Sequence, residues 1–498
     1  MSHSVRSGES AAPRSEPSPA PAAPTAAPIP LWPGLVATAI AGLVYLAVGS
    51  GGTFHFLPST FVHHTLTADA WLRGRLFATR DDLIGQFLRN RALRRWEVAA
   101  SERTADQLLQ DFRDEVTAEM RRRGHPEYGS DAAVSRALTV ALHDWVRIGD
   151  RYYAYWPPLP VVLMLPSVWI SGPAASDVLV TNLLGAAATL FIFLMLRALQ
   201  RSWPQLTTSA CVALTLAYSF GTCLLYQACF GQVWYLTQIS ASVFLIVAVC
   251  CGLHAMQRPA WMGAAGVALG IAFLGRNTLI LAAPFFAVVL WIAVRDSSAP
   301  LRRFVRYGSL FTAAVLAAIA IQLAFNHARF GDVFDFGQGH LAEAGGNPRF
   351  AGDYKQYGRF NLHYVPHNLW YYFLNPRMGP LGGRRAPSDG QLSFDPEGNS
   401  LFLVSPFMLY LFTCWRRRDL LLAAVLAGAL PGTAALMLFH GTGWYQFGQR
   451  YLLDTMPFLL ILAAFGMQGR LTWTAATLIA LSMVVNAWGT YRFHVEQP

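Results

Sequence analysis

The sequence predicts an all-α polytopic membrane protein with about 11 to 13 transmembrane helices and two large outside loops. Of its 498 residues, 54% are hydrophobic and 13% are charged, whereas a soluble domain carries roughly 25% charged residues. The mean hydropathy is +0.34. Several apolar runs reach about 20 residues, the length of a helix that crosses a bilayer core. The runs are continuous and do not alternate, which argues against a barrel.

The charges and the cysteines exclude other classes of protein. The formal net charge is +10, but the arginines lie mostly in short loops between apolar runs, which favours a topology signal over nucleic-acid binding. The six cysteines have neither ligand spacing nor an extracellular disulfide framework, so we interpret them as packing residues. They are Cys211, Cys223, Cys229, Cys250, Cys251 and Cys414.

The composition of the N-terminal region predicts that this region lies on the cytoplasmic side of the membrane. Residues 1–30 are rich in Pro, Ala and Ser and are expected to be a disordered cytoplasmic tail. Residues 31–50 then form the first crossing, of signal-anchor type, with Arg6 and Arg14 before it. Residues 31–498 are therefore expected to form one transmembrane domain in the cytoplasmic (inner) membrane.

Residues 51–153 are expected to form the first outside loop. Its middle, residues 86–123, is charged and has the pattern of a helix, since apolar residues recur at every fourth position. We expect that apolar face to lie on the membrane interface or to pack on the bundle, and the insert to be solvated without a catalytic part. The apolar positions are Leu108, Phe112, Val116 and Met120.

Further apolar runs give the predicted topology. They lie near residues 177–199, 206–226, 236–256, 260–275, 278–294, 308–326, 400–415, 419–439, 451–466 and 472–490. Arginines at 295–306 and 416–418 mark the cytoplasmic side, which leaves residues 327–399 as the second outside loop. Two arrangements remain open. Either residues 157–171 cross the membrane only partly, or Arg197 and Arg201 face outward.

Residues 63–75 place a carboxylate, two histidines and two arginines just after the first crossing. Ionisable groups beside hydrocarbon are costly and usually have a task. Asp69 is the predicted catalytic base, which takes the proton of an acceptor hydroxyl in a glycosyl transfer. The alternative is an ion pair with Arg73 one helical turn later. His64 is a predicted substrate contact. A divalent metal on His55, His63 and His64 is possible, although interfacial histidines are the preferred interpretation.

Two arginines are predicted to bind the donor phosphate. Arg276 lies between two apolar runs on the expected outer side, against the positive-inside trend. Its planar guanidinium group can form two parallel hydrogen bonds to a lipid phosphate. The alternatives for Arg276 are an ion pair or a snorkelling side chain. Arg450 lies in the loop 441–454, where Trp444 could stack on a sugar ring. Its alternative is an ion pair with Asp454.

The end of the first outside loop supplies two weaker candidates. Asp150 could position an acceptor or a cation, and Tyr153 is a predicted substrate contact. A turn at Gly149-Asp150 is the simpler interpretation of this aspartate. No P-loop, dinucleotide fingerprint, Gly-x-Ser-x-Gly elbow or Cys-x-x-Cys pair is present, so a soluble nucleotide-sugar site is not supported.

Four segments resemble the GT-C superfamily of polytopic glycosyltransferases, and in particular the bacterial relatives of protein O-mannosyltransferases and lipid A aminoarabinose transferases. They are the aspartate segment 66–76 (LTADAWLRGRL), the aromatic Pro-Pro segment 150–160 (DRYYAYWPPLP), residues 325–332 (FNHARFGD) and residues 447–457 (FGQRYLLDTMP). Together they span most of residues 31–490. The charged insert from about Asp82 to His143 departs from the family pattern.

This resemblance implies a GT-C-like bundle and an enzyme with a polyprenyl-phosphate-linked sugar as donor. The acceptor would be a glycan, a lipid or a protein outside the cytoplasm, and transfer would invert the anomeric carbon. It would make Asp69 the base, and Arg276 and Arg450 the contacts of the donor phosphate. Some members of the family need a divalent ion and others do not.

Two other classes of function remain open. A polytopic transporter or flippase of lipid or sugar, without transferase activity, would also contain buried arginines and a lipid-sized cavity, but its inverted repeats are not evident. A non-catalytic scaffold of envelope assembly is the third hypothesis. Asp69→Asn would discriminate, since an enzyme should lose sugar transfer and still bind the lipid donor.

Overall fold

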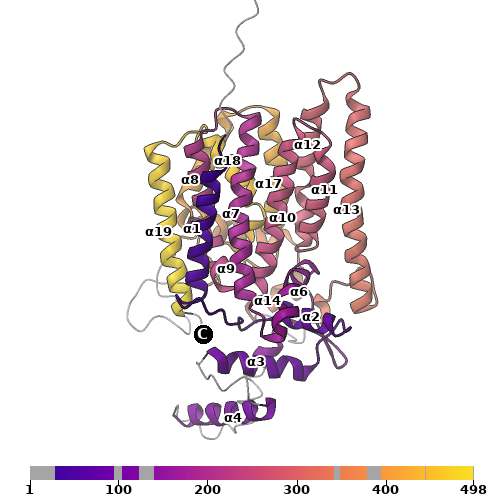
Figure 1. Cartoon of the computed structure of the whole chain (residues 1–498), viewed down its shortest axis with the longest axis vertical. Helices are drawn as coiled ribbons and strands as arrows, with labels where there is room; N and C mark the ends of the chain where they lie inside the picture. The colour runs from indigo at the N-terminus through magenta and orange to yellow at the C-terminus, as the bar shows by residue number, and fades with distance from the viewer. Residues whose placement is uncertain are drawn as a thin grey trace, which may run out of the picture.

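The computed structural model describes residues 29–94, 104–122, 139–340, 348–377, 394–443 and 445–496. Nearly all of the predicted tail 1–30, together with Trp444, therefore lies outside the described residues. The chain is an all-α polytopic membrane protein, whose long helices stand side by side (Figure 1). Its short strands form one two-stranded sheet in the described part of the chain.

The helices of the bundle follow the apolar runs of the sequence. They are α1 (Trp32–Gly49), α7 (Asp177–Ser202), α8 (Thr208–Phe220), α9 (Leu224–Phe230), α10 (Val233–Ala255), α11 (Trp261–Phe273), η4 (Asn277–Ala282), α12 (Ala283–Val294), α13 (Pro300–Phe330), η8 (Pro406–Arg416), α17 (Leu420–Leu438), η9 (Arg450–Asp454), α18 (Met456–Gly466) and α19 (Trp473–Glu496).

Length and composition identify six of the described helices as membrane spans, or seven if the bent pair α8 and α9, with 53° between them, is one span. Shorter apolar helices such as α11 and α18 supplement these spans. The predicted total of 11 to 13 crossings stays a prediction. Close helix packing uses small residues. A Cβ on Gly489 of α19, for example, would lie 2.1 Å from the ring of Phe447.

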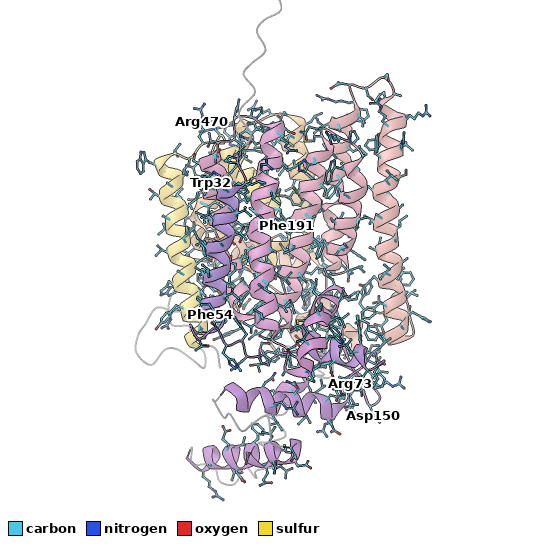
Figure 2. All side chains as sticks on the ribbon, in the orientation of Figure 1. Trp32, Phe54, Arg73, Asp150, Phe191 and Arg470 are labelled. Atoms are coloured by element: carbon cyan, nitrogen blue, oxygen red, sulfur yellow. The ribbon has the colours of Figure 1, made fainter. Side chains whose placement is uncertain are left out.

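The arginine-rich ends of the helices identify the cytoplasmic side. Arg197 near the end of α7 donates from Nε to the Ile29 carbonyl at 2.7 Å, so it lies at the end where the described chain begins. Trp32 and Arg470 lie at this same end, and Phe54, Arg73 and Asp150 lie at the opposite end (Figure 2). By the positive-inside rule, we expect the first end to be cytoplasmic and the other end to be outside.

Helix α6 (Leu159–Ser171) favours one of the two predicted topologies. It has 13 residues, contains Pro166 and packs against α2 (His63–Leu72) at the outer end of the bundle. After α6 and the short η3 (Gly172–Ala174), the chain is still outside, because Ser176 at the start of α7 donates its hydroxyl to the Leu57 carbonyl. Helix α6 and the start of α7 therefore lie at the end of the bundle opposite the Arg197–Ile29 contact, which is the arrangement expected if residues 157–171 cross only partly.

The first outside loop folds into helices and a hairpin. It contains α2, α3 (Arg80–Arg94), α4 (Ala105–Arg122), η2 (Thr139–Leu142) and the antiparallel strands β1 (Trp145–Ile148) and β2 (Arg151–Ala154), in which Trp145 pairs with Ala154. Helices α3 and α4 run across the axes of the bundle helices (Figure 1). The apolar face of α4 packs on α3 through Leu108, Phe112 and Leu88. The expectation that this face meets the membrane or the bundle was wrong.

The second outside loop is made of short helices that lead back to the bundle. They are η5 (Gln338–His340), α14 (Pro348–Tyr357), η6 (Leu362–Tyr364), α15 (Val365–Leu369), the π-helix η7 (Trp370–Leu374) and α16 (Leu401–Val404). Arg329, at the end of α13, connects the two outside loops. Its Nη1 donates to the carbonyls of Ala154 and Trp156 at 2.5 and 3.2 Å. All six cysteines are free thiols, and four of them are buried, as a packing role predicts.

Candidate functional site

The two histidines of α2 are buried, which corrects the prediction of interfacial side chains. His63 stacks on Trp145 with ring centroids 4.6 Å apart, and His64 lies 2.7 Å from the Thr237 hydroxyl of α10. Burial lowers the pKa of His63 to about 4 and that of His64 to about 3. Both imidazoles are therefore neutral at physiological pH and hold α2 against α10 and the hairpin.

Asp69 lies further along α2, on its more exposed side. Its carboxylate pairs with Arg73 at 2.9 Å, and its side chain is 14% exposed. This is the helical ion pair that the spacing of the two residues predicts. Asp69 stands at the outer end of the molecule, where a catalytic acceptor base was expected, but of the described arginines it pairs with Arg73 and not with Arg276 or Arg450.

Asp150 and Tyr153 belong to the hairpin. Asp150 is exposed in the two-residue turn between β1 and β2, after Gly149 with φ of +59°. This is the turn that Gly149-Asp150 predicts. Tyr153 is buried between the rings of Phe77 and Phe330. Their surroundings explain both residues as structural.

Arg276 pairs with Asp454, 178 residues later in the chain. Its Nε donates to Asp454 Oδ2 at 2.8 Å, and the side chains are 19% and 7% exposed. Gln238 of α10 donates to Asp454 Oδ1 at 3.1 Å, and the Thr278 hydroxyl lies 3.4 Å from Oδ2. The ion-pair alternative for Arg276 is therefore observed. The predicted Arg450–Asp454 pair is wrong. At the end of the 3-10 turn η9, the Asp454 carboxylate pairs with Arg276 instead.

Arg450 is buried without a carboxylate partner among the described residues. It is 6% exposed, its Nη2 lies 3.5 Å from the Tyr451 hydroxyl, and its Nε has no hydrogen-bond partner. Its guanidinium carbon lies 5.1 and 5.9 Å from the ring centroids of Tyr451 and Tyr235, within the range of a cation–π contact. Among the described residues, tyrosines are the neighbours of this buried cation, an arrangement that could accommodate an anion.

The two arginines form one cluster around Tyr451. Their guanidinium carbons lie 5.2 Å (Arg276) and 5.1 Å (Arg450) from the centroid of this ring. Burial raises the pKa of the Tyr155 and Tyr372 hydroxyls well above the usual value, and the positive charges of both arginines oppose that rise. The Tyr372 hydroxyl is buried without a hydrogen-bond partner. The cluster therefore offers unused donors beside two positive charges.

Helix α10 joins α2 to this cluster. The Thr237 hydroxyl forms a hydrogen bond with His64 Nε2. The next residue, Gln238, donates from Nε2 to the Arg450 carbonyl at 2.6 Å and to the Asp454 carboxylate. The structure thus brings Arg276 and Arg450 together and links α2 to them through helix α10. Asp69 lies five residues further along α2 than His64.

No family model matches this chain, and no curated protein matches it. Among solved structures, it is similar to the crystal structure of ArnT from Cupriavidus metallidurans bound to undecaprenyl phosphate. The two chains share 14% identity with a TM-score of 0.44, and the match covers 91% of this chain and 63% of that one. No site residue is carried over from that protein.

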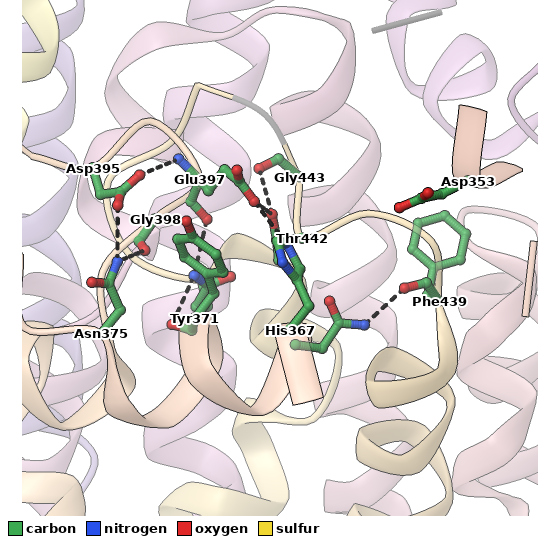
Figure 3. A network of polar contacts seen from close by, with 12 residues as sticks. Asp353, His367, Tyr371, Asn375, Asp395, Glu397, Gly398, Phe439, Thr442 and Gly443 are labelled. Carbon is green, nitrogen blue, oxygen red and sulfur yellow. Dashed lines mark hydrogen bonds and ion pairs between the residues drawn. The ribbon is translucent and has the colours of Figure 1, made fainter. Parts of the chain in front are cut away.

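The sequence did not single out a second polar cluster at the outer end, drawn in Figure 3. His367 of α15 and Glu397 pair at 2.9 Å, and the carboxylate is fully buried. Glu397 lies in a turn segment, 394–400, that reads as an ordinary polar loop. The signal that could have found it is the presence of ionisable residues next to apolar runs. No group of three or more metal-ligating side chains occurs in the described residues.

Proposed function

We propose that this protein is a membrane glycosyltransferase that moves a sugar from a polyprenyl-phosphate donor to an acceptor on the outer side of the cytoplasmic membrane, with inversion. The observation that carries the proposal is Arg450, a buried cation without a carboxylate partner in the described chain, beside Arg276 at the outer end of an apolar bundle. A lipid whose apolar tail lies along the helices and whose phosphate reaches two arginines matches this arrangement.

The arginines would stabilise the leaving phosphate. In the transfer, the acceptor oxygen forms a bond to the anomeric carbon, and the bond from that carbon to the phosphate oxygen breaks. The phosphate keeps the electron pair, and its added negative charge is met by Arg276 and Arg450 in a site with little water. Asp69 is the proposed base that takes the proton of the acceptor hydroxyl. Its pair with Arg73 would hold the carboxylate in one direction.

The test uses purified full-length protein in lipid nanodiscs with a panel of labelled polyprenyl-phosphate sugars. The expected result is release of polyprenyl phosphate in the presence of an acceptor. Asp69→Asn should abolish release and leave polyprenyl-phosphate binding intact. Movement of the intact donor between leaflets without cleavage would instead identify a flippase. Absence of both binding and cleavage across the panel would contradict the proposal. Parallel reactions with a chelator show whether a divalent ion is needed.

A further inference from the structure

The His367–Glu397 pair has the features of a built polar site. The Glu397 side chain is 0% exposed, and its Oε2 lies 2.9 Å from His367 Nε2. The Thr442 hydroxyl lies 3.5 Å from the same carboxylate oxygen. His367 is the accessible member, with 37% of its side chain exposed. Burying a carboxylate is costly and is tolerated where it is hydrogen-bonded. A buried carboxylate that is hydrogen-bonded to a part-exposed imidazole fixes the orientation of the ring toward a bound ligand.

Hydrogen bonds connect this pair to the arginine cluster. Gln446 and Gln449 both donate from Nε2 to the Glu397 carbonyl, at 3.0 and 3.1 Å, and the next residue in the chain is Arg450. The turn that carries Glu397 packs closely on these amides. A Cβ on Gly398, whose φ is +92°, would lie 2.6 Å from Gln449 Nε2. The pair and Arg450 are therefore parts of one packed segment.

An unpartnered acceptor lies between the pair and Arg450. Gln446 is fully buried, and its Oε1 has no hydrogen-bond partner. Gln446 Oε1 and Arg450 Nε, which also has no partner, both border Gly443, at 2.7 and 3.1 Å from the position that a Cβ there would occupy. Unused polar atoms in a buried segment call for an explanation, and a polar ligand supplies one.

His367 packs against the ring of one tyrosine. Its ring lies 4.7 Å from that of Tyr371, the second residue of the π-helix η7. Trp370, the preceding residue, is 41% exposed. The wider turn of a π-helix often marks a functional position. Here it places Tyr371 against His367 and the next residue, Tyr372, near the arginine cluster.

We propose that His367, oriented by Glu397, binds a hydroxyl of a glycan-type acceptor beside the donor phosphate site. The proposal rests on the proposed glycosyltransferase function and adds to it the place and the chemical class of the acceptor. Imidazole and buried amides pair with sugar hydroxyls, and Trp370, which is 41% exposed and three residues after His367, could offer its face to a pyranose ring. Asp69 and His367 then have separate tasks, since His367 binds the acceptor and Glu397 acts as a positioning residue.

The experiment measures transfer from the active polyprenyl-phosphate sugar to octyl glucoside, octyl galactoside and octyl mannoside, and also hydrolysis of the donor without acceptor. His367→Gln is expected to raise the KM for the octyl glycoside by about 10-fold, the effect of losing one hydrogen bond to a polar group. The KM of the donor and its hydrolysis rate should not change. The matched control is His363→Gln, which alters a histidine of the same outer loop that is 42% exposed and lies beside the exposed Asp353.

The role of Glu397 is tested with a conservative substitution and with a double-mutant comparison of KM values. Glu397→Gln keeps an acceptor for the imidazole and should keep most of the affinity for the glycoside, whereas Glu397→Ala should lose it. In a His367→Gln background, Glu397→Ala should have no further effect on KM, which separates positioning from a general loss of structure. Thermal unfolding with polyprenyl phosphate checks that the donor site of each variant is intact.

Three results would overturn the assignment. The first is an equal KM for His367→Gln and the wild type. The second is an equal loss with His363→Gln. The third is donor hydrolysis without transfer to any of the glycosides. If the wild type neither binds nor cleaves a polyprenyl-phosphate sugar, it is the glycosyltransferase proposal that fails, and the acceptor assignment falls with it.

Discussion

Arg450 provides the sharpest prediction, because a structural arginine and an anion-binding arginine respond oppositely to removal of the charge. Its cation–π contacts with Tyr235 and Tyr451 contribute about 0.5–2 kcal/mol each. Two terms lower the stability of the folded protein. The unpartnered Nε costs about 1–3 kcal/mol, and the burial of the charge costs several kcal/mol more. Arg450→Gln should therefore leave the free energy of unfolding unchanged or raise it.

Binding should change in the opposite direction. A charge-assisted hydrogen bond contributes about 1.5–3 kcal/mol, so Arg450→Gln should weaken polyprenyl-phosphate binding by about 10- to 150-fold. Arg450→Lys keeps the charge but loses the planar fork and should give an intermediate loss. The assay combines thermal unfolding in nanodiscs with titration of polyprenyl phosphate. A large fall in Tm together with wild-type affinity for polyprenyl phosphate would refute the reasoning.

Three further predictions concern the surroundings of the cluster. Asp454→Asn should leave the Arg276 guanidinium without its ion pair and lower the free energy of unfolding by about 3 kcal/mol, measured by denaturant titration; an unchanged midpoint would argue against the pair. Asp69→Asn should abolish sugar transfer with little change in Tm, because its partner Arg73 is exposed, and retained transfer would exclude Asp69 as the base. His63 and His64 have folded pKa values of about 4 and 3, below the usual 6.5, so the unfolded chain binds protons that the folded chain does not. Stability should be complete above about pH 6.5 and fall as the pH drops toward 4, by about 1.4 kcal/mol per pH unit for each histidine, and His64→Gln should reduce that slope in pH-dependent unfolding.

The bundle was predictable because a bilayer sets the length of an apolar helix. The runs 177–199, 236–256 and 419–439 became α7, α10 and α17 with boundaries moved by a few residues. The partial crossing of α6 was one of two open alternatives, since arginine positions alone could not decide between them. Hydrogen bonds across the bundle, such as Arg197 to Ile29, favour the partial crossing.

The candidate site was only partly predictable, because its contacts join distant parts of the chain. Arg276 and Arg450 were selected for their place beside apolar runs, and the structure brings both to Tyr451. Local spacing suggested that Arg450 pairs with Asp454. The 3-10 geometry of η9 and the approach of Arg276, 178 residues away, give a different pair.

His367 and Glu397 were missed for the same reason. The two residues come from different segments of the second outside loop and are 30 positions apart. In the sequence, Glu397 lies among Asp, Pro, Gly and Asn, a composition typical of a solvated turn. The turn is held by Gln446 and Gln449, which donate to the Glu397 carbonyl, and one sequence contains no record of these contacts.

The measurement that tests the central claim most directly is single-turnover release of polyprenyl phosphate from a labelled polyprenyl-phosphate sugar, compared between the wild type and Arg450→Gln. The account predicts cleavage with inversion of the anomeric carbon in the wild type, and a loss of at least about 10-fold in the variant when both proteins remain folded. Equal cleavage by both proteins, or cleavage by neither with any donor, would contradict it.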